Sequence, residues 1–290
     1  MEWLRETGML GVSACQTGMI SVSGGCEIVL VRVICDSSEP REFVLRRIIN
    51  QDWLGREGDL VHREATALQL IGGVPVPTPG VVATDSSGLR TGRPCLLMTR
   101  LSGQPWNDCR NINVETLAEL ATTLRMLHDY DCGGGLTQLP PYRPHHWRTE
   151  RMAAPPTWTQ HMNTWNRAVA MVLAWDDATA RSARPRLIHR DYRLGNTLWR
   201  DNRLVGVVDW ITACYGDSNA DVGHCRWNLC RAYGPEAADS FSKLYDLKHY
   251  DPLWDLLAVV GGVLDTPPQN SDEASRLDYF VEAAVSARLC

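Results

Sequence analysis

The chain has 290 residues, of which 44% are hydrophobic, and a formal net charge of -5 at pH 7. This length and apolar content suit two packed lobes and exclude a disordered chain. The acidic balance and the lack of a lysine- or arginine-rich run argue against nucleic acid or an anionic membrane as the main partner, and no apolar run approaches the ~20 residues of a membrane span.

The first predicted element is a hairpin. Two runs of alternating apolar residues, 19–22 and 28–33, flank Gly24 and Gly25. Such a pattern predicts two antiparallel strands joined by a flexible tip, and backbone amides at that tip could approach phosphate oxygens. A glycine pair alone more often marks an ordinary turn, so this second inference depends on motifs further along the chain.

A strand over residues 43–46 and a helix over residues 61–71 follow. The strand ends at Arg46. In the helix, four apolar residues recur at helical spacing, and Glu64 falls beside that stripe. We expect Glu64 to pair with Arg46, the alternative being that both are unrelated surface charges.

The proline-spaced segment 74–79 cannot continue a helix and should lead extended chain into a strand over residues 81–84. Residues 94–99 predict another strand. The sequence therefore predicts short extended segments between the helix over residues 61–71 and the first long helix.

That long helix is predicted over residues 114–130, where apolar residues define one face and three consecutive glycines end the segment. Residues 138–156 have little periodicity and predict a long connection, of the kind that often shapes a substrate site. A second helix is expected over residues 158–180.

The most informative segment lies between two short apolar runs, 187–188 and 204–208, that predict buried strands. It contains His-Arg-Asp and, five residues after Asp191, Asn196, which is the spacing of kinase catalytic loops. Asp191 could orient an acceptor hydroxyl and take its proton, while Asn196 and Asp209 could supply oxygen ligands to Mg²⁺. Local turn hydrogen bonds are the simpler explanation of such residues, but the matched spacing favours the functional one.

Four further helices are expected after Asp209, over residues 222–233, 236–247, 252–264 and 273–289. Asp217 could cap the first of them. Three acidic residues on or beside these helices could line a site for a cationic acceptor or could equally be solvated; they are Asp239, Asp251 and Asp255.

Cysteine and histidine residues give no metal-site signal. The ten cysteines are scattered, none in a C-x-x-C motif, and no secretory signal is evident, so we expect reduced thiols in a cytoplasmic protein. His145 and His146 are adjacent and therefore point in different directions, with no nearby ligand to complete a set.

Together these motifs resemble, in identity and order, the aminoglycoside phosphotransferase family. The resemblance rests on Ser23-Gly24-Gly25, Phe43-Val44-Leu45-Arg46, Glu64, Val74-Pro75-Val76-Pro77, Leu96-Leu97-Met98, the Asp191 loop and Asp209. It implies an α+β, two-lobed protein-kinase-like fold: a small antiparallel-sheet lobe with one helix over residues 1–98, a hinge at 99–101, and a larger, mainly helical lobe over 102–290.

The resemblance also implies roles for individual residues. Gly24 and Gly25 would cover the phosphates of the nucleotide, and Arg46 would stand where kinases keep a phosphate-contacting lysine, paired with Glu64. Thr99 and Leu101, with Arg100 between them, would offer backbone groups to the purine base.

The same resemblance gives Asp221 a structural role, which is to brace the catalytic loop. For His189 we expect, from its place in the loop, that it packs beneath the metal-binding aspartate and holds backbone rather than taking part in the chemistry. Two departures stand out, since Arg190 replaces a frequent glycine and Cys26-Glu27 replaces Ser-Asn.

We therefore expect a kinase that uses Mg²⁺ and ATP or GTP to phosphorylate a hydroxyl of a small polar molecule, an aminoglycoside or related antibiotic, with a cationic acceptor among the candidates. A metabolic kinase for an amino alcohol, amino acid or sugar derivative is the alternative. A pseudokinase is disfavoured because Asp191, Asn196 and Asp209 are all present, and a protein kinase because no Ala-Pro-Glu segment follows Asp209.

Overall fold

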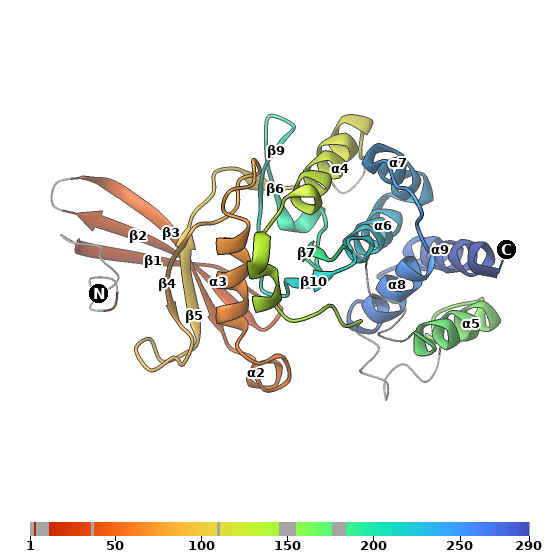
Figure 1. Ribbon diagram of the computed structural model, residues 1–290, viewed down its shortest axis with the longest axis horizontal. Coiled ribbons are helices and arrows are strands. Elements are labelled where there is room, and N and C mark those ends of the chain that lie inside the picture. The colour runs from red at the N-terminus through yellow and green to blue at the C-terminus, as the bar shows by residue number, and fades with distance from the viewer. Residues whose placement is uncertain are drawn as a thin grey trace. The chain divides into compact units, whose positions relative to one another are not determined.

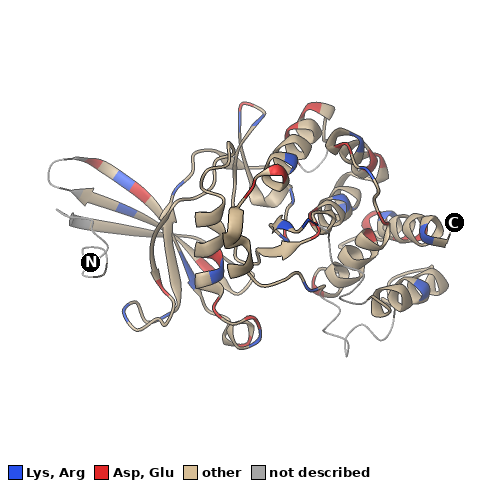
Figure 2. Cartoon of the chain, viewed as in Figure 1, with Lys and Arg blue, Asp and Glu red and all other residues tan. Residues whose placement is uncertain are grey.

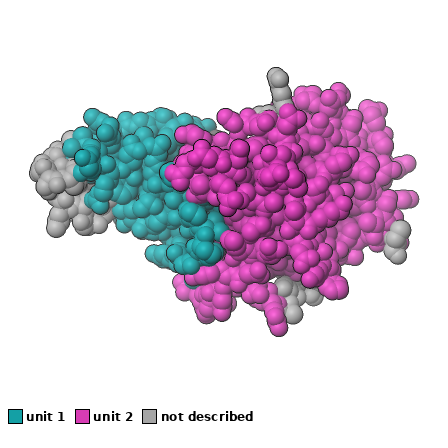
Figure 3. All heavy atoms as spheres, turned by 90° about the horizontal axis from the view of Figure 1, so that it is seen from above, with its two compact units in different colours: residues 1–102, 206–212 teal, residues 103–205, 213–290 magenta. Residues whose placement is uncertain are grey.

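The computed structural model describes residue 3 and residues 12–35, 38–108, 111–144, 155–175 and 184–289. Contacts divide the chain into two compact units (Figure 3). Unit 1 comprises Met1–Ser102 and Gly206–Thr212, and unit 2 comprises Gly103–Val205 and Ala213–Cys290. The short segment Gly206–Thr212 thus belongs with the amino-terminal unit although it lies far along the chain.

Unit 1 is built on a five-stranded antiparallel sheet with the order β1-β2-β3-β5-β4 (Figure 1). Its strands are β1 Val12–Ser23, β2 Cys26–Cys35, β3 Ser38–Ile48, β4 Val81–Asp85 and β5 Cys95–Thr99. The predicted hairpin is confirmed: Ser23 pairs with Cys26 around a turn in which Gly24 and Gly25 have φ of 58° and 80°. Only glycine adopts such angles without strain.

The core of this sheet follows from strand alternation. Val29, Val31 and Val33 point to one face of β2 and are buried, together with Phe43 of β3 and Leu97 of β5. Side chains of a strand alternate between faces, so these three valines share one side of the sheet. Burial of this apolar face fixes the register of β2 against β3.

Two helices follow β3, where the sequence predicted one. The expected helix is α3, Leu60–Leu70, capped by Asp59, whose side chain accepts from the His62 N–H at 2.8 Å. The additional helix is α2, Gln51–Glu57, capped in the same way by Asn50. It spans only 7 residues and has no buried residue, so the sequence carries no apolar periodicity that could have predicted it.

Unit 2 is mainly helical (Figure 1). Its helices are α4 Val114–Asp129, α5 Met162–Leu173, α6 Asn219–Tyr233, α7 Pro235–Tyr245, α8 Leu253–Asp265 and α9 Ser271–Leu289. Its short strands are β6 Gln104–Pro105, β7 Arg186–Ile188, β8 Thr197–Arg200, β9 Arg203–Val207 and β10 Cys214–Gly216, with the end of β9 reaching unit 1. The predicted α+β class, with an antiparallel amino-terminal sheet and a helical remainder, is confirmed.

One predicted helix is shorter than expected. We expected a helix over residues 158–180, but α5 begins at Met162 and ends at Leu173. Trp158 lies in a turn before it, because the Thr159 hydroxyl bonds to the buried Asp278 carboxylate at 2.5 Å and holds the chain out of the helix. Residues 176–180 lie outside the described residues, as do His145 and His146.

Charged residues, cysteines and the hydrophobicity of the helices bear on what the composition predicts. Basic and acidic residues are interspersed along the helices of unit 2 (Figure 2). Seven cysteines in the described part of the chain are free thiols. Within the same ranges, every helix is too short or too polar to cross a membrane.

Candidate active site

The predicted catalytic loop lies in unit 2, between β7 and β8. The Tyr192 ring is completely buried, and its hydroxyl donates to the Leu120 carbonyl of α4 at 2.9 Å. At the start of the loop, the backbone N–H groups of His189 and Arg190 donate to the two carboxylate oxygens of Asp221, at 2.8 and 2.6 Å. The expected bracing role of Asp221 is therefore confirmed.

Asp221 is itself deeply buried on α6, and His128 of α4 lies 3.1 Å from its Oδ2. A buried carboxylate must be compensated by hydrogen bonds or charge, and these three donors do so. The loop is thus connected to two helices of unit 2 through one acidic side chain.

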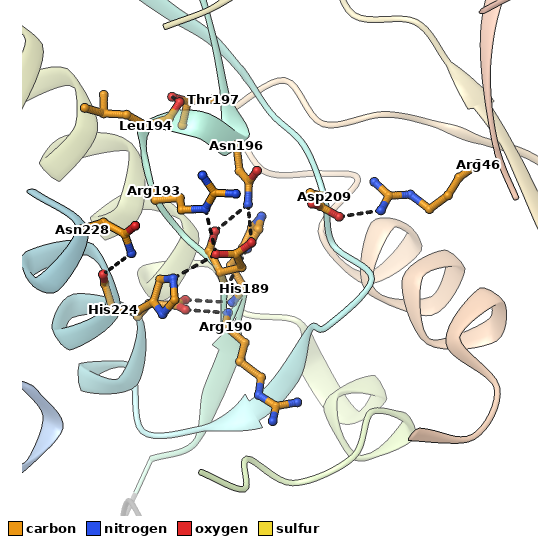
Figure 4. A network of polar contacts seen from close by, with 12 residues as sticks. Arg46, His189, Arg190, Arg193, Leu194, Asn196, Thr197, Asp209, His224 and Asn228 are labelled. Carbon is orange, nitrogen blue, oxygen red and sulfur yellow. Dashed lines mark hydrogen bonds and ion pairs between the residues drawn. The ribbon is translucent and has the colours of Figure 1, made fainter. Parts of the chain in front are cut away.

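Arg190 has a φ of 70°, a left-handed conformation that favours glycine. For another residue this conformation costs roughly 1–2 kcal/mol. The bond from its N–H to Asp221 holds the backbone there. Its side chain points away from Asn196 (Figure 4) and donates to the Arg143 carbonyl at 3.0 Å. The observed backbone explains why glycine would suit this position.

Three side chains that Figure 4 labels, Arg193, Asn196 and His224, bond to the carboxylate of Asp191. Its Oδ1 accepts from Arg193 Nε at 3.0 Å and lies 2.9 Å from His224 Nε2, while its Oδ2 accepts from Asn196 Nδ2 at 2.8 Å. About a third of the side chain, 32%, remains exposed. The carboxylate is held in one orientation and still open to a ligand.

These partners also set the ionisation of Asp191. Burial raises the pKa of this carboxyl, but the hydrogen bond and charge of His224, followed by the charges of Arg193 and His189, outweigh burial and hold the pKa below its ordinary value. Asp191 therefore stays ionised at neutral pH. Such a group is suited to orient a hydroxyl and to receive its proton late in a reaction.

Asn196 is buried, and its Nδ2 donates both to the backbone oxygen and to the side chain of Asp191, each at 2.8 Å. These two bonds assign the orientation of the amide, so the donor side faces Asp191 and Oδ1 is directed elsewhere. An amide oxygen fixed in this way suits a hard cation.

His224 is the site residue that the sequence analysis missed. It lies on α6, 33 residues after Asp191, and Asn228 donates to its backbone oxygen at 2.9 Å one turn later. It belongs to no motif that the sequence analysis identified. The available signal was its position three residues after Asp221, which places both side chains on the helix face that meets the loop.

The second group of predicted residues lies within unit 1. Arg46 Nη1 donates to Asp209 Oδ1 at 2.6 Å, and Arg46 Nε lies 3.2 Å from Glu64 Oε2. The expected pair of Arg46 with Glu64 is therefore present. The bond to Asp209 is an addition that the sequence did not predict (Figure 4).

Burial and charge oppose each other in this group. Burial raises the pKa of Glu64 to about 7, and the charge of Arg46 offsets only part of that increase. Burial also lowers the pKa of Arg46, but the charges of Glu64 and Asp209 outweigh it and raise that pKa above its ordinary value. The guanidinium is permanently charged between two acidic side chains.

Asp209 follows β9 and has a φ of 72°, a second left-handed non-glycine residue. Two residues earlier, the Val207 N–H donates to the Pro77 carbonyl of unit 1 at 3.0 Å. The side chain of Asp209 is 31% exposed. The segment thus presents a carboxylate at a fixed position in unit 1.

Gly24 and Gly25 differ in their surroundings. A Cβ on Gly25 would lie 2.8 Å from the Asn50 Cβ, and its carbonyl accepts from the Ile49 and Asn50 N–H groups at 2.9 and 3.1 Å. Gly24 has open space around it. Gly25 therefore packs against the start of α2, and Gly24 is the one whose backbone a ligand could approach.

The predicted hinge begins at the end of β5. The Thr99 N–H donates to the Gly80 carbonyl at 2.8 Å, and its hydroxyl accepts from the Gly80 N–H at 2.7 Å. The Thr99 N–H is therefore already paired within unit 1. Leu101 follows in irregular chain, and Arg100 between them pairs with Glu42.

Asn196 and Asp209, each within its own unit, carry the kind of oxygen donor that Mg²⁺ prefers. No cluster of three or more His, Cys, Asp or Glu side chains in the described ranges could hold a metal ion. Mg²⁺ usually takes one or two protein carboxylates and completes its shell with phosphate oxygens and water. An Asn196 oxygen and an Asp209 carboxylate match that chemistry.

Comparisons with known proteins give a consistent result. Residues 31–258 match the model of the APH phosphotransferase enzyme family. No curated protein matches the sequence. Solved structures are similar over nearly the whole chain, and their low identity means that they show the fold alone.

Three of these structures illustrate the similarity. Aminoglycoside phosphotransferase APH(4)-Ia has 13% identity, covers 99% of each chain and gives a TM-score of 0.63. APH(2")-IIa, solved with streptomycin and ATP, has 14% identity, coverage of 99% of this chain and 95% of that one, and a TM-score of 0.58. Macrolide 2'-phosphotransferase MphH from Brachybacterium faecium has 17% identity, coverage of 98% and 97%, and a TM-score of 0.59. The predicted kinase-like fold is confirmed.

Proposed function

The chain belongs to the phosphotransferase enzyme family, and from this we propose that it transfers the γ-phosphoryl group of ATP or GTP to a hydroxyl group of a small polar molecule. The observation that carries the proposal is the environment of Asp191: an ionised, partly exposed carboxylate held by Asn196, Arg193 and His224. Phosphoryl transfer depends mainly on positioning and charge stabilisation, and this arrangement supplies positioning.

Asp191 would accept a hydrogen bond from the acceptor hydroxyl and aim its oxygen at the phosphoryl group. Because its partners favour the ionised form, it receives the proton only as the new bond to phosphorus forms. His224 and Arg193 act by holding the carboxylate, and the bond from Asn196 keeps its second oxygen in place. Asp191 is therefore the proposed catalytic residue.

The nucleotide would be bound by residues of unit 1. We assign its phosphates to Arg46 and to the backbone at Gly24 and Gly25, and its base to backbone groups of Thr99 and Leu101. Glu64 orients Arg46 through their ion pair. A guanidinium with two edges can contact phosphate oxygens while it keeps an acidic partner.

Magnesium is the implied cofactor, with Asn196 and Asp209 as its proposed protein ligands. When bound, it neutralises the charge that spreads over the transferring phosphoryl group. The guanidinium of Arg46 donates to Asp209 and so holds this carboxylate in place within unit 1.

The acceptor class rests on the relatives. Solved structures of similar fold are enzymes crystallised with hygromycin B or streptomycin, and one is a macrolide phosphotransferase. An aminoglycoside or related antibiotic is thus the first class to examine. A metabolic acceptor such as an amino alcohol, amino acid or sugar derivative is the second class, because the proposed role of Asp191 requires only a hydroxyl group of the acceptor.

The test is a phosphate-transfer screen of aminoglycosides, macrolides, peptide antibiotics and small metabolites with ATP and with GTP. Asp191→Ala should lower turnover about 10²-fold or more and leave nucleotide binding intact. Asp209→Ala should remove the Mg²⁺-dependent part of nucleotide affinity. Asp239→Ala, at a largely exposed position, is the control. Folded protein that binds nucleotide but phosphorylates nothing in the screen would contradict the proposal.

A further inference from the structure

A cavity of about 190 Å³ lies in unit 2 beside the catalytic loop. It is formed by the loop, by α6 and by the segment before α4. Its principal lining residues are Trp106, Arg193, Leu194, Asn228, Leu229 and Tyr233. In the proposed reaction, this is where the body of an acceptor would lie.

Two lining residues connect the cavity to Asp191. Arg193 donates through Nε to the Asp191 carboxylate at 3.0 Å. Asn228 bonds to the backbone of His224, whose ring reaches the same carboxylate oxygen at 2.9 Å. A ligand in the cavity is therefore one side chain away from the proposed catalytic group.

The cavity has an unusual charge for an aminoglycoside site. Of the described residues that line it, none is acidic, and the charged one is Arg193, whose side chain is 40% exposed. An ammonium group leaving water needs a carboxylate partner, because burying an unpaired charge is costly. A polycationic acceptor would find no acidic side chain among these residues, and the one charged group, Arg193, is already paired with Asp191.

The aromatic lining favours an apolar ring. Trp106 Nε1 donates to the Tyr233 hydroxyl at 2.9 Å, and that hydroxyl donates to the Asp108 backbone oxygen at 2.6 Å. Trp106 also packs edge-to-face on Trp199, with ring centroids 5.0 Å apart. Since the polar atoms of both rings already have partners, the rings are fixed and offer their carbon surfaces.

The three acidic residues that the sequence analysis offered for a cationic site each lie beside an arginine; they are Asp239, Asp251 and Asp255. Asp255 accepts from Arg226 Nε at 3.0 Å, and Asp239 lies 3.4 Å from Nη1 of the same arginine. Asp251 lies 3.0 Å from Arg288. These carboxylates are compensated within unit 2.

We propose that the acceptor is an alcohol without ammonium groups, whose apolar ring packs against Trp106 and Tyr233 and whose oxygen atoms accept hydrogen bonds from Arg193. This assignment rests on the proposed phosphotransfer function and narrows its acceptor class. It ranks uncharged and anionic alcohols above polycationic aminoglycosides as acceptors. It differs from the expectation, drawn from the sequence, that a cationic acceptor is among the candidates.

The test uses three aryl glycosides of equal size: phenyl β-glucoside, phenyl β-glucuronide and phenyl 2-amino-2-deoxy-β-glucoside. Their binding to the full chain without nucleotide is measured by ligand-observed NMR titration. We expect the neutral and anionic glycosides to bind about fivefold or more tightly than the cationic one, because no described lining residue offers a carboxylate to an ammonium group.

A variant with a carboxylate in the cavity sharpens the test. Asn228→Asp should improve binding of the cationic glycoside about threefold and weaken the anionic one to a similar degree. Asn270→Asp makes the same chemical change at an exposed position, where Asn270 caps α9 by accepting from the Glu273 N–H. This control should leave the order of the three glycosides unchanged.

Binding and turnover separate the two proposals. Equal or tighter binding of the cationic glycoside to the wild type, or no binding of any of the three, overturns the acceptor assignment. Phosphorylation of hygromycin B or streptomycin with no response to the neutral glycoside also overturns it and leaves the kinase proposal standing. The expected binding order with no phosphate transfer to any alcohol supports the cavity assignment and rejects the kinase proposal.

Discussion

Replacing Asp221 with alanine should destabilise unit 2 and free the catalytic loop. The change removes the acceptor of two backbone N–H groups, at 2.8 and 2.6 Å, and the partner of His128 at 3.1 Å. Hydrogen bonds to a charged group contribute about 1.5–3 kcal/mol each, and the donors left behind are buried, so the two backbone bonds alone give a loss of about 3–6 kcal/mol. That is a large part of the about 5–15 kcal/mol of a typical domain. Asp221→Asn keeps the shape but presents an NH₂ to one donor and should lose about half as much.

Urea denaturation followed by tryptophan fluorescence measures the loss, and hydrogen exchange locates it. Exchange should accelerate in residues 187–196, which include the two released amides, and should not change in residues 26–48 of unit 1. Asp239→Ala, an exposed partner of Arg226, is the matched control and should cost less than about 0.5 kcal/mol. An Asp221→Ala variant within about 1 kcal/mol of the wild type, with a protected loop, would refute the assignment of Asp221 as the brace.

Three further changes test other parts of the structure. His224→Ala should lower turnover about tenfold with little change in nucleotide affinity, and His224→Gln, which can still donate to Asp191, should recover part of it; equal turnover in steady-state assays of all three proteins would contradict the network. Asp246→Gly should raise stability by about 0.5–1 kcal/mol in thermal unfolding, because Asp246 ends α7 at a φ of 60° where glycine is unstrained; a lower melting temperature would count against it. Burial raises the pKa of the Cys26 thiol from its ordinary 9.0 to about 11. The stability that the neutral thiol gives is therefore complete below pH 9 and is lost as the pH rises through 11. Cys26→Ala should flatten the fall of the unfolding free energy over this pH range, and an unchanged slope would show that other groups cause the fall.

Elements with a clear local signal were predictable from the sequence. The hairpin around Gly24 and Gly25 needed only alternation and a glycine pair, and α3 and α4 needed only helical spacing of apolar residues. Of the apolar residues that define the hairpin, Met19, Ile20 and Val22 of β1 are exposed. In α3 and α4 the residues that define the pattern are buried, and in β2 Val29, Val31 and Val33 are. Local pattern and packing agree there, so a pattern suffices.

The start of α5 shows where such patterns fail. A bond between Thr159 and Asp278, 119 residues apart, determines the conformation before this helix. Apolar spacing over residues 158–161 cannot reveal that partner. Boundaries depend on contacts with other elements more than the helix interior does.

The candidate site divides in the same way. Asp191, Asn196 and Asp209 were found through spacing along the chain, and their roles stay predictions. The His224 bond to Asp191 and the Arg46 bond to Asp209 join residues 33 and 163 positions apart. No motif contains both members of either pair, so these contacts required coordinates.

The excursion of Gly206–Thr212 into unit 1 has a consequence for biosynthesis. The amino-terminal sheet obtains Asp209, the partner of Arg46, only after residue 212 has left the ribosome, by which time about a hundred residues of unit 2 have been made. A nascent chain halted after residue 102 would hold Arg46 and Glu64 without the second acid. Unit 1 can therefore be completed only after much of unit 2 has been translated. A gene cut after residue 102 would encode Arg46 and Asp209 on separate chains.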